Sequence, residues 1–171
     1  MAPTIDIRPW SDVDRAVLAR NDTPAMTAFL GGPEGEDGVD RRHALFLRQQ
    51  RDGIAWPFTV WSSEQGEAVG SVAYWLVDHA GEAAYECGWA IATRHQGRGY
   101  ARGALRMLLE HAAQHGERET VYAFPRIDNV ASSALARSVG FEHRGVEGFE
   151  YPAGVPIDVD VTPGEFVAVL A

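Results

Sequence analysis

The 171-residue sequence contains one cysteine, Cys87, and this scarcity excludes an internal disulfide. Long apolar runs are also missing, because no stretch approaches the ~20 apolar residues that a membrane-spanning helix needs. Residues 1–8 lack the basic segment and the apolar run that together form a secretory signal. We therefore expect a soluble, cytoplasmic protein.

Positive charge is scarce too. The chain has 15 Lys and Arg against 24 Asp and Glu, a formal net charge of -9. This balance disfavours a nucleic-acid partner and an anionic membrane surface. A negative field would suit a cationic amine substrate, although acidity for solubility alone is the competing explanation. The six histidines are scattered and form no metal-ligand pattern with Cys87, so no metal is expected.

The length and the 46% hydrophobic content predict a single domain over residues 1–171. Alternation and apolar runs predict strands at 4–8, 56–62, 68–77, 83–92, 120–124 and 141–151 and from 157, with helices at 12–19, 38–50, 101–115 and 130–139. Residues 21–37 are predicted to form a loop with one helical turn at 25–30, and a turn at 162–165 is expected to interrupt the last strand. This mixed order indicates an α+β (mixed α/β) fold with helices flanking a largely antiparallel sheet of about seven strands.

Residues 96–101, here the glycine loop, lie between a predicted strand and a helix with one apolar stripe. Gly97 and Gly99 permit backbone angles and close approaches that a Cβ would forbid, so successive N–H groups can converge at the positive end of the helix. That geometry binds phosphate. The dinucleotide fingerprint does not fit because position 102 is Arg, and a P-loop does not fit because Gly-Lys-Ser/Thr is absent.

Two motifs carry a family resemblance. Gln96, Gly99 and Ala101 match the Gln/Arg-x-x-Gly-x-Gly/Ala signature of the GNAT acyl-CoA N-acyltransferases. About 30 residues further on, residues 129–141 resemble the second signature of the family, Asn-x-x-Ser/Ala ahead of a helix that ends in Gly-Phe. If the first motif is considered alone, an ordinary glycine turn before a helix is the competing explanation. The two together resemble the branch of ribosomal-protein N-terminal acetyltransferases, with specific motifs only at 85–141.

The resemblance implies a sheet splayed between the strands at 83–92 and 120–124, with the pantetheine arm of acetyl-CoA in the gap. It implies acetyl transfer to a primary amine, either a protein N-terminus or a small molecule, by direct attack in a ternary complex. A catalytically idle acyl-CoA sensor or interaction module is the alternative, and a homodimer is left open. The implied cofactor-binding residues are Trp89, Ile91, Gln96, Gly97, Arg98, Gly99, Tyr100, Ala101, Arg102, Asn129 and Ser132.

Glu86 is the predicted general base, because it lies in an otherwise apolar strand where burial would raise the pKa of its carboxyl. It also matches a Glu that many family members use; a solvated or ion-paired carboxylate is the alternative. Many family members have a Tyr that protonates the leaving thiolate, but this sequence has Ala136 at that position. The departure puts a Tyr general acid in doubt. By resemblance, Ser132 lies near the thiolate, with helix capping as its other role. Cys87 points to the opposite sheet face and is expected to be a core thiol.

The segment that joins the first two helices forms one wall of the acceptor cleft in the family. Met26, Phe29 and Leu30 are therefore predicted to contact the substrate together with Glu86, with plain packing as the alternative. Acidic residues expected on the same loop could attract a cationic amine; these are Glu34, Glu36 and Asp37. If they do not, Trp75 and Tyr74 are further candidates for substrate preference.

Overall fold

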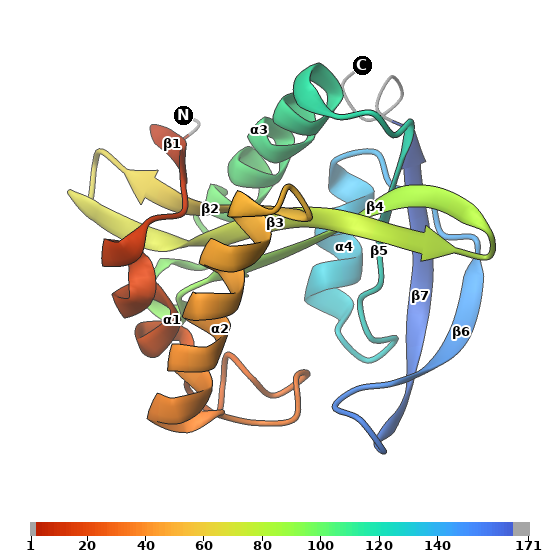
Figure 1. Cartoon of the computed structure of the whole chain (residues 1–171), viewed down its shortest axis with the longest axis horizontal. Helices are drawn as coiled ribbons and strands as arrows, with labels where there is room; N and C mark the ends of the chain where they lie inside the picture. The colour runs from red at the N-terminus through yellow and green to blue at the C-terminus, as the bar shows by residue number, and fades with distance from the viewer. Residues whose placement is uncertain (1–2, 166–171) are drawn as a thin grey trace.

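The computed structural model describes residues 3–165, which form one seven-stranded sheet flanked by four α-helices (Figure 1). The strands are β1 (Ile5–Pro9), β2 (Ala55–Ser62), β3 (Glu67–His79), β4 (Glu82–Ile91), β5 (Thr120–Ala123), β6 (Gly145–Glu150) and β7 (Pro156–Glu165). The helices are α1 (Arg15–Asn21), α2 (Gly35–Arg51), α3 (Tyr100–His115) and α4 (Val130–Ser138), with short 3-10 helices η1 (Asp12–Asp14) and η2 (Thr93–His95). No helix within residues 3–165 is long and apolar enough to cross a membrane.

The sheet order is β1-β2-β3-β4-β5-β7-β6, and every neighbouring pair is antiparallel except β4 and β5. The predicted mixed α/β fold with about seven largely antiparallel strands is confirmed. A two-residue hairpin loop joins β3 to β4, with Ala80 at φ 53° and Gly81 at φ 81°. Positive φ at both positions is what a tight hairpin turn with the twist of its strands requires. This turn fixes the register of β3 against β4.

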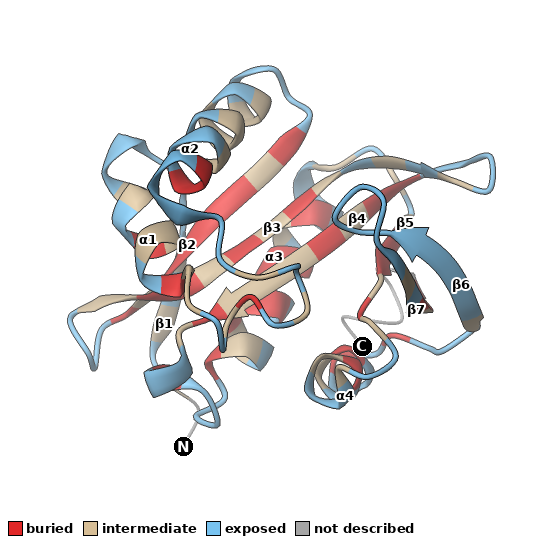
Figure 2. Ribbon diagram, turned by 90° about the horizontal axis from the view of Figure 1, so that it is seen from below, coloured by how far each residue is buried: buried red, intermediate tan, exposed pale blue. Residues whose placement is uncertain are grey.

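The sheet splays between β4 and β5. The two strands pair only at Tyr85 with Val121 and at Glu86 with Tyr122. Beyond Glu86, β4 continues to Ile91 without a β5 partner. In Figure 2 the part of the sheet that holds β5, β6 and β7 stands apart from the β1–β4 part. The splayed sheet expected between these strands is therefore present.

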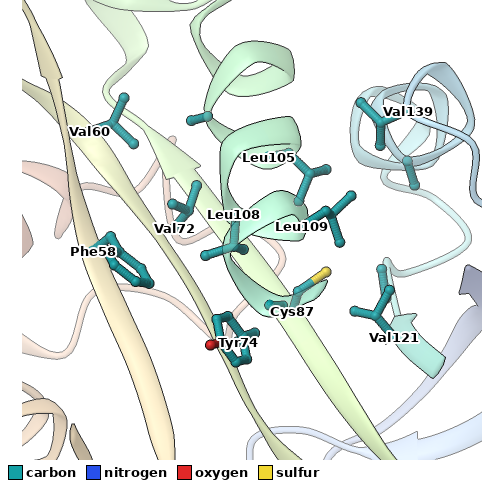
Figure 3. Close-up of a cluster of buried hydrophobic side chains, with 14 of the residues drawn as sticks. Phe58, Val60, Val72, Tyr74, Cys87, Leu105, Leu108, Leu109, Val121 and Val139 are labelled. Atoms are coloured by element: carbon teal, nitrogen blue, oxygen red, sulfur yellow. The ribbon is translucent and has the colours of Figure 1, made fainter. Parts of the chain in front are cut away.

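The main core lies between the sheet and α3 (Figure 3). Leu105, Leu108 and Leu109 form the apolar stripe of α3 and are at most 1% exposed. Cys87 packs in the same cluster and is 4% exposed, which confirms that it is a core thiol. The helices α1 and α2 cover the opposite face of β2 and β3 (Figure 1). Because side chains alternate along a strand, Glu86 points toward that opposite face.

Several predicted boundaries are wrong. Residues 25–30 form turns and no helix, and α2 begins at Gly35, so two of the acidic residues expected on the loop lie in its first turn. β6 begins at Gly145 and is shorter than predicted. The predicted break at 162–165 is absent, because β7 runs through Pro163. β6 pairs no further than Val161, so Pro163 has a neighbouring strand on one side only, where proline is tolerated. The predicted tail at 166–170 lies outside the described residues.

Candidate functional site

The glycine loop has the backbone geometry of an anion site. Gly97 has φ 73° and Gly99, the N-cap of α3, has φ 83°, both in the left-handed region. The N–H of Gly103 donates to the carbonyl of Gly99 at 3.0 Å. The N–H groups of Tyr100 and Ala101 precede this first helical bond and have no acceptor within the helix. They lie at the positive end of α3, where an anion is stabilised.

Gln96 fastens the glycine loop to its surroundings. Its Nε2 donates to the carbonyl oxygen of Ile91 at 2.9 Å and also lies 3.3 Å from the sulfur of Met26. The side chain therefore joins the end of β4 to the segment between α1 and α2. Both contacts use its amide nitrogen, so the side chain of Gln96 holds the glycine loop in place.

Two arginines at the glycine loop are exposed: Arg98 lies within the loop, and Arg102 lies in the first turn of α3. The ion pairs found between described residues involve neither of them. Arg94, by contrast, is bound to Glu67 at 2.7 Å. Arg98 and Arg102 are therefore available to an anionic ligand, and a guanidinium suits phosphate well.

Two backbone donors of β4 face the gap in the sheet. The N–H of Ala92 donates to Val69 of β3 at 2.9 Å. Donor direction alternates along a strand, so the N–H groups of Trp89 and Ile91 point away from β3. β5 pairs with β4 only as far as Glu86, so no strand meets these two groups. Two such donors can stabilise an oxyanion.

Glu86 lies on the other sheet face from the α3 core, and its carboxylate has one hydrogen-bond partner among residues 3–165. The indole Nε1 of Trp75 donates to its Oε2 at 3.2 Å. Burial raises the pKa of Glu86 to about 7, and the hydrogen bond from Trp75 acts in the opposite direction. No ion pair within residues 3–165 involves Glu86, so the ion-paired alternative does not apply. A carboxyl with this pKa can exchange a proton near neutral pH.

The start of α4 follows β5 in the chain and is attached to β7 through Ser133 and Asp160. Asn129 is the N-cap of α4, and its Oδ1 accepts from the N–H of Ser132 at 3.2 Å. Capping thus occupies the side-chain oxygen of Asn129 and leaves its amide donor for another partner. Ser132 is partly buried, and the next residue, Ser133, donates to Asp160 at 2.8 Å. Ala136 is fully buried in the core and carries no group that could act as an acid.

Residues 22–34, here the acceptor loop, lie between the glycine loop and the turn of β6 and β7. Met26 contacts Gln96, and the guanidinium of Arg126 lies over the ring of Phe29 at 5.7 Å. Leu30 is 46% exposed. A Cβ built on Gly31 would come within 2.6 Å of Pro152, so the acceptor loop touches that turn. Figure 1 shows the loop, in orange, and the blue β6–β7 turn projecting on the same side of the molecule.

The acidic residues near the acceptor loop are largely paired within the chain. Glu34 forms an ion pair with Arg42, and Glu36 lies 2.6 Å from Arg15. Their charges are therefore less available to attract an amine than the sequence suggested. Tyr74 does not face Glu86 either, because it is buried on the α3 side with its hydroxyl 3.1 Å from His111.

Sequence reasoning missed three residues of this region: Arg126 beside Phe29, Pro152 against the acceptor loop, and Trp75 as the partner of Glu86. The first two depend on contacts between segments far apart in the chain. Trp75 could have been placed from the hairpin: a two-residue loop at 80–81 puts residue 79 opposite 82 and hence residue 75 opposite Glu86.

The fold resembles those of solved acetyltransferases. One is a spermidine N-acetyltransferase from Vibrio cholerae in complex with CoA and spermine, with 20% identity, 98% of each chain covered and a TM-score of 0.78. Another is RimL, a ribosomal L7/L12 alpha-N-protein acetyltransferase, with 21% identity, 95% of this chain and 90% of the other covered, and a TM-score of 0.80. A third is a putative acetyltransferase from Salmonella typhimurium with its cofactor acetyl-CoA, with 20% identity, 95% and 94% coverage and a TM-score of 0.73.

A search of curated protein sequences finds no match. The family model described as the acetyltransferase (GNAT) domain matches residues 5–142, which include the glycine loop, Glu86 and α4. The chain therefore belongs to the GNAT acetyltransferase family.

Proposed function

We propose that the protein transfers the acetyl group of acetyl-CoA to a primary amine. The observation that carries the proposal is the arrangement around β4: the unmet N–H groups of Trp89 and Ile91 face the gap, and Glu86, with a pKa of about 7, lies on the same strand. The similar solved structures are named as acetyltransferases of spermidine and of a ribosomal protein α-amine. Both acceptors are amines.

The described residues fit coenzyme A. In the proposal, the N–H groups of the glycine loop, with Arg98 and Arg102, bind its phosphates. The open edge of β4 takes the pantetheine arm, with the N–H of Trp89 and of Ile91 as donors to that arm and to the acetyl carbonyl. The free amide donor of Asn129 would complete this binding from the other side of the gap. Among the described residues, no hydrogen-bond acceptor is found for the N–H groups of Trp89 and Ile91 or for the side-chain amide of Asn129.

Glu86 is the proposed general base. An amine acceptor is an ammonium ion at neutral pH and must lose a proton before it can attack. Glu86 takes that proton, directly or through water, and the amine nitrogen bonds to the acetyl carbonyl carbon. The C–S bond then breaks, the second proton of the amine nitrogen passes to the departing thiolate to give the free thiol, and the Ser132 hydroxyl donates a hydrogen bond to that sulfur. The backbone donors of β4 stabilise the charge that develops on the carbonyl oxygen.

Transfer is proposed to be direct, within a ternary complex. A covalent relay would need an activated cysteine, but Cys87 is buried on the α3 face. Burial raises the pKa of its thiol well above the usual range, so the thiolate is not formed at neutral pH. The acceptor would enter beside the acceptor loop, where Met26, Phe29 and Leu30 are the proposed contacts.

One observation favours a second candidate, an acyl-CoA-binding module without turnover: Ala136 occupies the position where the family often has a Tyr acid, and it is fully buried. Release of free thiol from acetyl-CoA discriminates between the two. The panel comprises peptides with a free N-terminus, linear polyamines and aminoglycosides, and product masses verify acetylation. We expect amine-dependent thiol release with at least one class. Tight acetyl-CoA binding without thiol release from any class would favour the module.

A further inference from the structure

Trp75 is the direct cross-strand neighbour of Glu86. The register of β3 and β4 places the two residues opposite one another, so their side chains lie on the same sheet face. The indole Nε1 is 3.2 Å from Oε2 of Glu86. This hydrogen bond is the only one found for the Glu86 carboxylate among the described residues. The indole therefore fixes the orientation of one carboxylate oxygen.

Gly88 makes this orientation of the indole feasible. A Cβ on Gly88 would lie 3.2 Å from Cη2 and 3.5 Å from Cζ3 of Trp75, and the shorter distance is tighter than most Cβ contacts in proteins. The six-membered ring therefore lies over the place of the missing side chain, while the N–H end reaches Glu86. A glycine inside a strand weakens it and often marks a close approach of another group. Here that group is the ring of Trp75.

We propose that Trp75 is a positioning residue for acetyl transfer, whose indole N–H holds the Glu86 carboxylate in one orientation and favours its ionised form, with Gly88 providing the room. The inference rests on the proposed function, in which Glu86 is the base. A base must point at the proton that it takes, and a hydrogen bond to one oxygen leaves the other oxygen free for that task. Trp75 itself need not touch either substrate.

The electrostatic surroundings agree with this role. Burial raises the pKa of Glu86 to about 7, and the Trp75 hydrogen bond is the one influence that lowers it. Tyr122 on β5 pairs with Glu86, and Cys87 follows it on β4. The pKa of each of these two groups is raised, chiefly by burial, so both are neutral near pH 7. No charged side chain within residues 3–165 contributes to the pKa shift of Glu86.

Trp75→Phe tests the proposal, because it keeps an aromatic ring and removes the N–H. We expect the acidic limb of the pH profile of kcat to move to higher pH by about one unit, because the ionised Glu86 carboxylate loses the indole N–H as a hydrogen-bond donor. At pH 7, kcat should fall roughly fivefold to tenfold, with part of the loss recovered at high pH, while the Kd of acetyl-CoA stays unchanged. The control is Trp61→Phe, which removes an indole N–H from β2 far from Glu86.

A second variant, Gly88→Ala, retains both partners and displaces the ring. It should move the acidic limb in the same direction, which keeps the proposal testable if Trp75→Phe does not fold. An unchanged limb in either folded variant overturns the role of Trp75. Glu86→Gln, measured in parallel, separates this failure from failure of the proposed function: if it retains the kcat and the acidic limb of the wild type, Glu86 is not the base and the proposed mechanism itself is wrong.

Discussion

Gly99 offers a sharp test of the coenzyme site. It has φ 83°, and a Cβ there would meet only Pro3, at an ordinary contact distance of 3.5 Å. A valine at this position is therefore opposed by the backbone conformation and not by crowding. The left-handed region costs an L-residue roughly 1–2 kcal/mol, and a β-branched residue is especially poorly tolerated.

We expect the glycine loop of Gly99→Val to relax to a negative φ, which turns its N–H groups away from one another. Binding of acetyl-CoA then requires residue 99 to return to the left-handed conformation, and the free energy of this change reduces the affinity. A cost of 1–2 kcal/mol corresponds to roughly 5- to 30-fold weaker binding. Titration calorimetry of the folded variant with acetyl-CoA measures this change.

Gly81→Val is the matched control. Gly81 also has φ 81° and open space around its missing Cβ, but it lies in the β3–β4 turn, at the other end of β4 from the glycine loop. The two substitutions impose a similar backbone strain, so only Gly99→Val should change the Kd of acetyl-CoA. An unchanged Kd in folded Gly99→Val, or an equal loss in Gly81→Val, would refute the assignment of the glycine loop.

Three further outcomes follow from the contacts. The pKa of Glu86 is about 7 when folded against a reference of 4.5, so the free energy of unfolding should fall by about 3 kcal/mol as pH rises from about 4.5 to about 7. Denaturant titrations of Glu86→Gln should lack this loss; an identical pH dependence would contradict the shift. Cys87→Ala should keep kcat within about threefold and give intersecting initial-rate plots, whereas parallel plots with acetylated Cys87 in the wild type would refute direct transfer. Glu34→Gln combined with Glu36→Gln should leave KM for the amine within about twofold, because both charges are already paired. A large increase in KM would contradict this and support the attraction of the amine by these carboxylates.

Local patterns were sufficient to predict much of the molecule. The stripe that includes Leu105 and Leu109 has the helical period, and the two faces of β4 follow from alternation, so α3 and the opposed directions of Glu86 and Cys87 were predictable. The glycine loop was predictable because a left-handed backbone at Gly99 has few alternatives to glycine.

Features that depend on distant segments were not predictable in the same way. Pro163 resembles a strand breaker until the pairing shows that β6 begins at Gly145, opposite Val161, and so never reaches Pro163. The acidic residue Glu34 looks free until α2 brings Arg42 beside it. The contact of Gly31 with Pro152 joins segments more than a hundred residues apart, and no period in the sequence encodes it.

The measurement that tests the central claim most directly is the pH dependence of kcat for wild type and Glu86→Gln, with an amine that supports thiol release and saturating acetyl-CoA. A base with a pKa of about 7 predicts that the rate of the wild type rises through neutral pH and then levels off. In Glu86→Gln this limb should vanish and kcat should fall by roughly 10²- to 10⁴-fold, while the Kd of acetyl-CoA is retained. A variant that turns over like the wild type, with the same limb, would contradict the claim that Glu86 takes the proton from the amine.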